Sequence, residues 1–332
     1  MKLRILTLAI LTSLCLAVPV RASGIKMSKA AQKLLASLPD NLKSQAMMAY
    51  DTPQKTNWHF IPKGKRKGLQ LREMNDEQQE LAMELVTECL SEQGLQKAKG
   101  IMSLETTLHQ FDGNRRVRDP RRYYFTFFGE PSDKGTWAFS YEGHHLSLNY
   151  VVKDGVLVCA TPSFFATNPA KVIDNRGAGP KLGSRFLARE EDLAFKLAHS
   201  LNKEQLSKAL VAAKSPRDMQ EGGKAQAQVG KPRGLPISEM TAEQAEVLNS
   251  LVVEYIKNVP SELADPWLKK VNADKQLYLA WAGSTKPGEP YSYTVQGEDF
   301  VVILYNTQGS PDGARSNHVH AVWRTIGHDF GK

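Results

Sequence analysis

The chain has 332 residues, of which 41% are hydrophobic and 23% are charged, and its formal net charge is +8 at pH 7. This length is sufficient for one large domain or two smaller ones with a substantial hydrophobic core. Basic and acidic residues are mixed along the chain, so the mild basic excess does not favour a nucleic-acid partner.

The first 22 residues have the pattern of a secretory signal peptide. Lys2 and Arg4 precede an apolar run from Ile5 to Val20, and a small-residue cleavage site follows. The run is short for a membrane span, which favours cleavage over a retained membrane anchor. We therefore expect a periplasmic or secreted protein, whose mature form has 40 basic and 35 acidic residues and no membrane span.

Residues 23–65 are expected to form a helical segment, after which part of the sequence is repeated. The stretch GLQLREMNDEQQELAMELV (68–86) matches GLPISEMTAEQAEVLNSLV (234–252) at a constant offset of 166 residues. Each copy begins a helix with an N-cap residue, Asn75 or Thr241, and a glutamine three residues later, which is a capping-box arrangement. Paired caps at one offset favour an internal duplication over chance resemblance.

The similarity continues into two regions with strand patterns. YYFTFFGEPSDKGTWAFSYEGHHLSL (123–148) resembles LYLAWAGSTKPGEPYSYTVQGEDFVV (277–302), each with an aromatic strand, a polar loop and a hairpin. The sequence therefore predicts an α+β protein of two similar halves, residues 66–213 and 234–332, each with helices packed on an antiparallel hairpin sheet. Residues 214–233 have no apolar period, and we interpret them as an interdomain linker or a long surface loop.

The hairpin FSYEGHHLSLNY (139–150) places histidines beside a small polar face. If Glu142 and Gly143 form the turn, strand alternation puts the aromatic residues on a core face and His145 above serines and Asn149 on the other face. Small polar side chains leave space around an imidazole, as a binding site requires. His144 is expected at the edge of the aromatic face.

A second histidine pair, His318 and His320, is found in NHVHAVWR. Residues two apart on a strand point to the same side, so both rings can bind one metal ion, and a third histidine from a neighbouring strand would complete a three-nitrogen site with an open position. We predict His145 as this third ligand and His144 as a further one. The alternative is a structural or hydrogen-bonding role, because H-x-H also occurs on ordinary exposed strands.

Two further residues near this pair are candidates for catalysis. Arg324 lies on the histidine face by parity and is suited to bind an anionic substrate group through its guanidinium fork, although a salt bridge at the strand end is the alternative. Asp329 is placed to orient an imidazole, and its alternative is a surface acid. The arginine-rich stretch GNRRVRDPRR (113–122) is expected to be a solvated loop.

Ordered segments along nearly the whole chain also match a known pattern. They include RDP (118–120), EGHHLSLN (142–149), FFATNPA (164–170), EEDLA (190–194), YNTQ (305–308) and NHVHAVWR (317–324). Together they resemble the bacterial family catalogued as domain of unknown function 3500, over about residues 28–331. The resemblance implies little about activity, because the family's name records that no function was assigned. Its segments contain Glu142 as a further catalytic candidate and three substrate-binding candidates, Asn149, Asn306 and Gln308.

Several function classes are excluded by missing motifs. The chain has no G-x-S-x-G, no glycine-rich phosphate loop and no H-E-x-x-H, so it is not a standard serine hydrolase, nucleotide-binding protein or zincin. Cys89 is expected in a helix and Cys159 in an apolar strand, without a nucleophilic role. The sequence does not define whether they pair, and it does not define an oligomeric state.

The leading hypothesis is an exported metal-dependent hydrolase. A divalent metal, zinc in first place, would act as a Lewis acid or activate water for attack on a small-molecule, ester or peptide substrate. Iron or copper with oxygen chemistry suits the same ligands. The alternative is a non-catalytic periplasmic protein that binds a metal or a small ligand.

Overall fold

The structure is a computed structural model that describes residues 22–114, 116–219 and 221–332. The predicted signal peptide lies outside these residues, apart from its last position. Within the described ranges, no helix has the length and hydrophobicity needed to cross a membrane.

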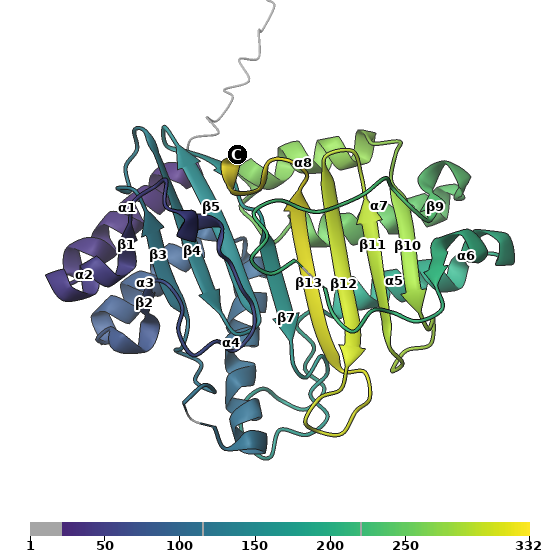
Figure 1. The fold of residues 1–332 in the computed structure, drawn as a ribbon, viewed down its shortest axis with the longest axis horizontal. Coiled ribbons are helices and arrows are strands. Elements are labelled where there is room, and N and C mark those ends of the chain that lie inside the picture. The colour runs from purple at the N-terminus through teal and green to yellow at the C-terminus, as the bar shows by residue number, and fades with distance from the viewer. Residues whose placement is uncertain (1–21, 115, 220) are drawn as a thin grey trace, which may run out of the picture.

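One large, mostly antiparallel sheet runs through the molecule (Figure 1). Its main path is, in order, β1 (Met47–Met48), β3 (Tyr124–Phe128), β4 (Thr136–Gly143), β5 (Leu146–Lys153), β7 (Ser163–Thr167), β13 (His318–Thr325), β12 (Phe300–Gln308), β11 (Tyr291–Gln296), β10 (Tyr278–Gly283) and β8 (Leu210–Ala212). Three short strands lie beside this path, with β2 (Leu69–Gln70) paired to β3, β6 (Val156–Cys159) to β5 and β9 (Leu235–Pro236) to β10.

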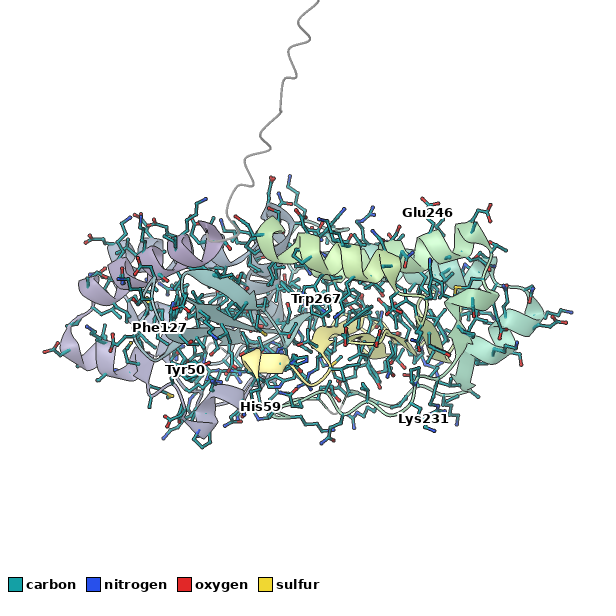
Figure 2. All side chains as sticks on the ribbon, turned by 90° about the horizontal axis from the view of Figure 1, so that it is seen from above. Tyr50, His59, Phe127, Lys231, Glu246 and Trp267 are labelled. Carbon is teal, nitrogen blue, oxygen red and sulfur yellow. The ribbon has the colours of Figure 1, made fainter. Side chains whose placement is uncertain are left out.

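Helices form a layer on one face of the sheet. The described α-helices are α1 (Ala22–Ser37), α2 (Asp40–Ala46), α3 (Asp76–Cys89), α4 (Glu92–Asp112), α5 (Ala188–Ser200), α6 (Lys203–Ala209), α7 (Ala242–Ile256) and α8 (Ser261–Ala273). Short 3-10 helices are η1 (Pro53–Thr56), η2 (Leu71–Glu73), η3 (Ile237–Glu239) and η4 (Asp329–Gly331). Figure 2 shows Glu246 of α7 on the helical side and Lys231 on the opposite side. The α+β class predicted from the sequence is confirmed.

The predicted capping boxes at Asn75 and Thr241 are confirmed. The glutamine of each box has a second use, because its side-chain amide donates to the last carbonyl of another helix. Gln78 Nε2 donates to Ser37 O of α1 (2.8 Å) and Gln244 Nε2 donates to Ser200 O of α5 (2.7 Å). These equivalent bonds fix α3 against α1 and α7 against α5.

The order of elements is the same in the two parts of the chain. The first part runs α1-α2-β1-β2-η2-α3-α4-β3-β4-β5-β7, and the second runs α5-α6-β8-β9-η3-α7-α8-β10-β11-β12-β13, with η1, β6 and η4 as additions. The helices at 190–213, which the sequence analysis assigned to the first half, lie with the second, because α5 packs on α7 and β8 pairs with β10. The two parts share one sheet, in which β7 pairs with β13.

The β4–β5 hairpin turns two residues later than the sequence analysis expected. Gly143 pairs with Leu146, so His144 and His145 form the turn instead of Glu142 and Gly143. Gly143 is needed within β4, because a Cβ there would lie 2.2 Å from the ring of Tyr123. Because the shift is two residues, the side chains that remain in β4 and β5 keep the faces that were predicted for them.

Residues 214–219 and 221–226, here called the strap, cross the sheet face opposite the helices. Met219 is buried in a small hydrophobic cluster with Trp58 and Phe60 on this face. Gly223 N–H donates to Trp58 O (2.7 Å), and Trp58 Nε1 donates to Lys224 O (3.0 Å). The segment that was interpreted as a linker or surface loop is therefore attached along the sheet.

The two cysteines of the described chain are both free and buried. Cys89 is the last residue of α3 and Cys159 the last residue of β6. Both elements are of the predicted type. Burial raises the pKa of each thiol, which disfavours the nucleophilic thiolate form.

Candidate metal centre

Three imidazoles meet where the β4–β5 turn reaches the centre of the sheet. Ala166 of β7 pairs with His320 of β13, and on its other side its N–H donates to His145 O (2.8 Å). His145, Ala166 and His320 therefore form a row across three neighbouring segments. The methyl side chain of Ala166 leaves space between the two rings.

The ring nitrogens converge. His318 Nε2 lies 2.9 Å from His145 Nε2 and 3.0 Å from His320 Nε2. The candidate ligand atoms of all three residues lie within 4.8 Å of one another. Nitrogen ligands that each stand about 2.1 Å from one ion are roughly 3 to 3.4 Å apart, so two of the three separations are close to those of a shared ion.

Asp218 of the strap determines the tautomer of His320. His320 Nδ1 donates to Asp218 Oδ1 (2.7 Å), and Gln308 Nε2 donates to Asp218 Oδ2 (3.1 Å). Because an ionised carboxylate only accepts, the proton of a neutral His320 stands on Nδ1, and Nε2 presents a lone pair to the other rings. A carboxylate behind the imidazole is the usual partner of a metal-bound histidine.

Burial keeps two of the rings in the neutral form that metals bind. Burial lowers the pKa of His145 well below its ordinary value, and the neighbouring histidines and Arg118 lower it further. Burial also lowers the pKa of His318 well below its ordinary value, with His320 as the next cause, while a hydrogen bond with the Gly309 backbone opposes the shift. A metal ion therefore has fewer protons to displace.

The backbone of His145 is strained. Its φ is +64°, in the left-handed region that costs a non-glycine residue roughly 1–2 kcal/mol. Its N–H donates to Phe60 O (2.8 Å), and its carbonyl accepts from Ala166, so both backbone groups fix the turn. A histidine at a position that suits glycine points to a role for its side chain.

His144, predicted as a further metal ligand, lies outside the converging group. Its Nδ1 makes a short hydrogen bond with Glu105 of α4 and lies 3.1 Å from Arg118 Nη1. Its ring is close to that of His145, with centroids 3.8 Å apart. Burial lowers the pKa of His144, and the Glu105 carboxylate opposes this shift. The ring therefore supports His145 from the side of the helical layer.

Glu142 and Asn149 lie on the polar face of the β4–β5 hairpin. The buried Glu142 carboxylate accepts from Lys67 Nζ (2.8 Å) and lies 3.7 Å from Arg66 Nη1. Asn149 Nδ2 donates to Pro162 O (2.9 Å), whereas its buried Oδ1 has no partner in the described chain. Glu142, predicted as catalytic, is thus already neutralised by two cations.

Arg324 and Asp329 form a separate buried cluster with Glu221 of the strap. Arg324 is fully buried, its Nε donates to Asp329 Oδ2 (2.8 Å), and its Nη1 makes a short ion pair with Glu221. Its Nη2 donates to Lys224 O (2.9 Å). Burial raises the pKa of Asp329, and Arg324 opposes this shift. The guanidinium fork that was predicted to bind a substrate anion is occupied by the protein's own groups.

Asn306 and Gln308 support the metal-site residues from β12. Asn306 Oδ1 accepts from His318 N–H (3.1 Å), and its Nδ2 donates to buried Glu191 of α5 (2.8 Å). Gln308 reaches the site through Asp218. Asn306 also lines a cavity of about 540 Å³ together with Lys171 and His199. These two predicted substrate-binding residues therefore have contacts that position His318 and His320.

Sequence reasoning missed Asp218, Glu105 and Arg118. Asp218 lies in a segment with no apolar period, and nothing local distinguishes it from the acids of a solvated loop. Glu105 ends IMSLE (101–105), a segment that also resembles the family, and that resemblance was the one available signal, because the burial of Glu105 on α4 is known only from the structure. Arg118 lies in the arginine-rich stretch that was expected to be solvated, yet it contacts His144.

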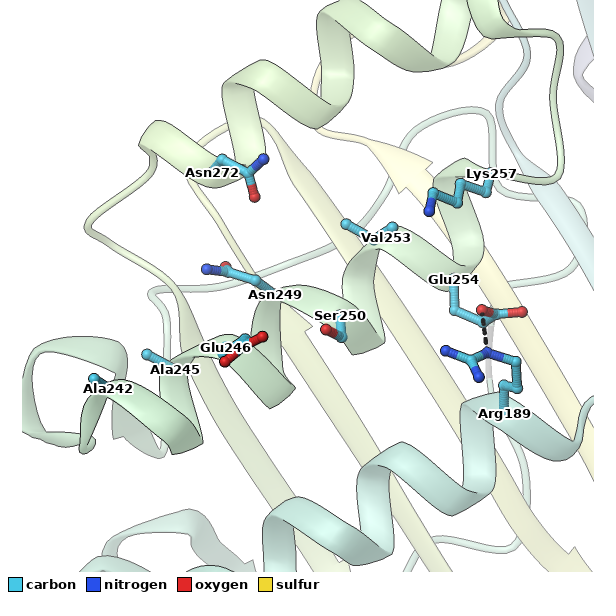
Figure 3. Close-up of a pocket in the computed structure, with 10 residues that line it drawn as sticks. All are labelled: Arg189, Ala242, Ala245, Glu246, Asn249, Ser250, Val253, Glu254, Lys257 and Asn272. Atoms are coloured by element: carbon cyan, nitrogen blue, oxygen red, sulfur yellow. Dashed lines mark hydrogen bonds and ion pairs between the residues drawn. The ribbon is translucent and has the colours of Figure 1, made fainter.

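A separate cavity lies in the helical layer (Figure 3). It has a volume of about 410 Å³ and is lined by residues of α5, α7 and the end of α8. Arg189 Nε donates to Glu254 Oε2 at one side of it (2.9 Å). Its lining includes none of the residues that the sequence predicted for the site.

Comparison with known proteins identifies a family and no characterised relative. No curated protein and no solved structure matches the chain. A family model described as "Protein of unknown function (DUF3500)" matches residues 21–332, which include every described helix and strand and the three converging histidines. The chain therefore belongs to the DUF3500 family, as its sequence segments predicted.

Proposed function

We propose that the protein binds one divalent transition-metal ion through the Nε2 atoms of His145, His318 and His320 and uses it in a hydrolytic reaction. The observation that carries this proposal is the convergence of three buried ring nitrogens while Asp218 accepts the Nδ1 proton of His320. Without an ion these nitrogens can only share ring protons with one another, whereas an ion would accept a lone pair from each of the three.

The ligand set suits activation of water. Three protein ligands with an open position are typical of catalytic zinc, which lowers the pKa of a bound water and polarises a carbonyl. His318 is the most exposed of the three residues, so a substrate would approach from its side. Asp218 would fix the ring of His320, and the His144–Glu105 pair would support the ring of His145.

Metal analysis of the purified protein tests the proposal most directly. The full chain should be prepared without a metal-chelating column and analysed by mass spectrometry for zinc, iron, copper and manganese. We expect about one equivalent of metal in the native protein and almost none in His318→Ala or His320→Ala, with folding retained. A native protein that takes up none of these ions, even when they are supplied, would exclude the site.

A non-catalytic role in metal or small-ligand binding is the second candidate. Only 4% of His145 and 5% of His320 is exposed, so two of the three rings leave little room for a bulky substrate. A screen of ester, peptide and other hydrolysable substrates, with and without a chelator, separates the two roles. A stoichiometric metalloprotein without turnover on any class would favour binding.

Export is part of the same proposal. A signal peptide over residues 1–22 would deliver the site to a compartment where metals are acquired outside the cytoplasm. Amino-terminal sequencing of the protein recovered from the periplasm or medium should give a first residue near Ser23. Recovery of a chain that still begins with Met1 would contradict export with cleavage.

A further inference from the structure

The three histidines occupy neighbouring positions on one face of the sheet, and a fourth position beside them lies just after β7. Ala166 separates His145 from His320, and Thr167 is paired with Val319. Carrying this register one residue beyond β7 places Asn168 beside His318. Strand alternation then puts Asn168 on the same face as Ala166 and the histidines.

The backbone hydrogen bonding of His318 indicates that its side chain lies close to that of Asn168. His318 N–H donates to Asn306 Oδ1, on the β12 side, and therefore points away from β7. β7 ends at Thr167, and the register continued by one residue would make His318 and Asn168 a pair without mutual backbone hydrogen bonds, the arrangement in which antiparallel side chains are closest. Their Cβ atoms are expected about 4.5–5.5 Å apart.

The amide oxygen of Asn168 makes no hydrogen bond within the described chain. Only 9% of the residue is exposed, and its Oδ1 is buried without a hydrogen-bond partner in the described chain. Asn149, on the same face, differs because its amide nitrogen is bonded to Pro162 O. A buried amide oxygen that lacks a partner is unfavourable unless a ligand supplies a donor.

We propose that Asn168 is a positioning residue whose amide oxygen accepts a hydrogen bond from the ligand at the open side of the metal centre. The inference rests on the proposed metal site and deepens it, because it selects the ligand class. Ligands with an O–H or N–H next to the metal-binding atom are favoured over ligands that lack one. Of the two acyl substrates considered above, the amide carries such a donor and the ester does not.

Cobalt(II) provides a direct test, since its visible absorption reports ligands that enter the coordination sphere. The full-length protein loaded with cobalt is titrated with acetohydroxamate, which carries an N–H beside its metal-binding oxygens, and with azide, which carries no donor. In Asn168→Leu, acetohydroxamate affinity should fall about tenfold, the worth of one hydrogen bond, while azide affinity stays within about twofold. Asn249→Leu is the matched control, because that amide oxygen also lacks a partner but lies on α7 at the cavity of Figure 3.

Each outcome decides a different point. A wild-type protein that takes up no cobalt overturns the metal site and this inference together. Cobalt uptake with an unchanged ratio of the two affinities in Asn168→Leu, or an equal loss of both, overturns only the role of Asn168. If Asn168→Leu does not fold, Asn168→Asp replaces it: the acceptor is kept, so the ratio should stay at the wild-type value, and a tenfold fall in the ratio would contradict the inference.

Discussion

At the scale of single residues, the ring and the backbone of His145 have separable roles. His145→Gly and His145→Ala both remove the ring, so both should abolish stable metal uptake. The free energy of unfolding of His145→Gly should nevertheless be about 0.5–1 kcal/mol higher than that of His145→Ala. Glycine adopts a φ of +64° without strain, and this relief outweighs the larger conformational entropy that glycine gives the unfolded chain. Urea denaturation of the chelator-treated variants measures the difference, and an alanine variant of equal stability would argue against strain.

The lowered pKa values of His145 and His318 couple the folding of the metal-free protein to pH. Both rings fold in the neutral form, whereas in the unfolded chain they take up protons below about pH 6.5. Because the folded pKa values are the lower ones, the stability they give is present above pH 6.5 and is lost as the pH falls towards the folded values. Each ring contributes a slope of up to about 1.4 kcal/mol per pH unit.

Urea denaturation of metal-free protein at pH 7.5, 6.5 and 5.5 checks this coupling. The free energy of unfolding should fall between pH 6.5 and 5.5, and His318→Ala should have a shallower fall than the wild type. Equal pH slopes in the two proteins would show that His318 folds with its proton.

The pair of candidate ligands His318 and His320 could be predicted because it depends on local sequence alone. The two-residue spacing of His318 and His320 fixes their common face whatever lies beside the strand. His145 could be predicted despite the misplaced turn, since the error was an even number of residues. The positions of Asp218 and Asn168 near the histidines could not be predicted, because they depend on which segments cross or lie beside β13.

At the scale of elements, the strap is attached to β13 at two acidic side chains. Asp218→Asn should weaken metal affinity by about 10- to 100-fold while the protein stays folded, because an amide holds the His320 ring less firmly and does not raise its basicity. Competition with a chromophoric chelator measures the loss. Asp174→Asn, at an exposed ion pair with Arg176, is the control and should leave the affinity unchanged. Undiminished affinity in Asp218→Asn would remove Asp218 from the site.

The second attachment of the strap is the ion pair between Glu221 and Arg324. Replacing Arg324 tests whether this residue has a structural or a catalytic role. Arg324→Met leaves the carboxylates of Glu221 and Asp329 without their buried cation and should cost about 3–5 kcal/mol of stability. Metal content per folded molecule should not change. Arg176→Met, at the surface, should cost at most about 1 kcal/mol. A stable Arg324→Met protein that binds metal but has lost activity would instead support the catalytic assignment from the sequence.

At the scale of the whole molecule, the candidate site lies across the junction of the two similar parts. His145 comes from the first part and His318 and His320 from the second, and the parts meet through β7 and β13. A buried cluster also joins their helices, in which Lys97 Nζ of α4 donates to Glu190 Oε1 of α5 (2.8 Å) and Glu254 Oε1 of α7 (2.9 Å).

We propose that the matching order of elements reflects an internal duplication. The two parts, residues 22–187 and 188–332, should each fail to bind metal when produced alone, and should bind it when produced together, because the ligands are divided between them. Metal titration of the separate and combined parts provides the measurement. Binding by one part alone would contradict the divided ligand set. An experimental structure in which residues 66–150 and 232–306 do not superpose would contradict the duplication.

The α+β class and the capped helices could be predicted because hydrophobic periodicity and capping residues are recognisable within short stretches of sequence. The continuous sheet could not. Pairing of β7 with β13 joins segments at distant places in the chain, and no local pattern specifies the partner of Phe164 or Val322. The contacts of the region 190–213 could not be predicted for the same reason, since its own sequence does not specify that α5 packs on α7 or that β8 pairs with β10.

The position of β13 in the sheet has a consequence for the order of assembly. This strand leaves the ribosome after all the other described strands, yet it lies between β7 and β12 in the middle of the path. Until it inserts, two unpaired strand edges face each other, and His145 has no partner ring. The proposed set of three metal ligands is complete only when the last strand to be synthesised has closed the sheet, so a bound ion would mark a polypeptide that has finished folding.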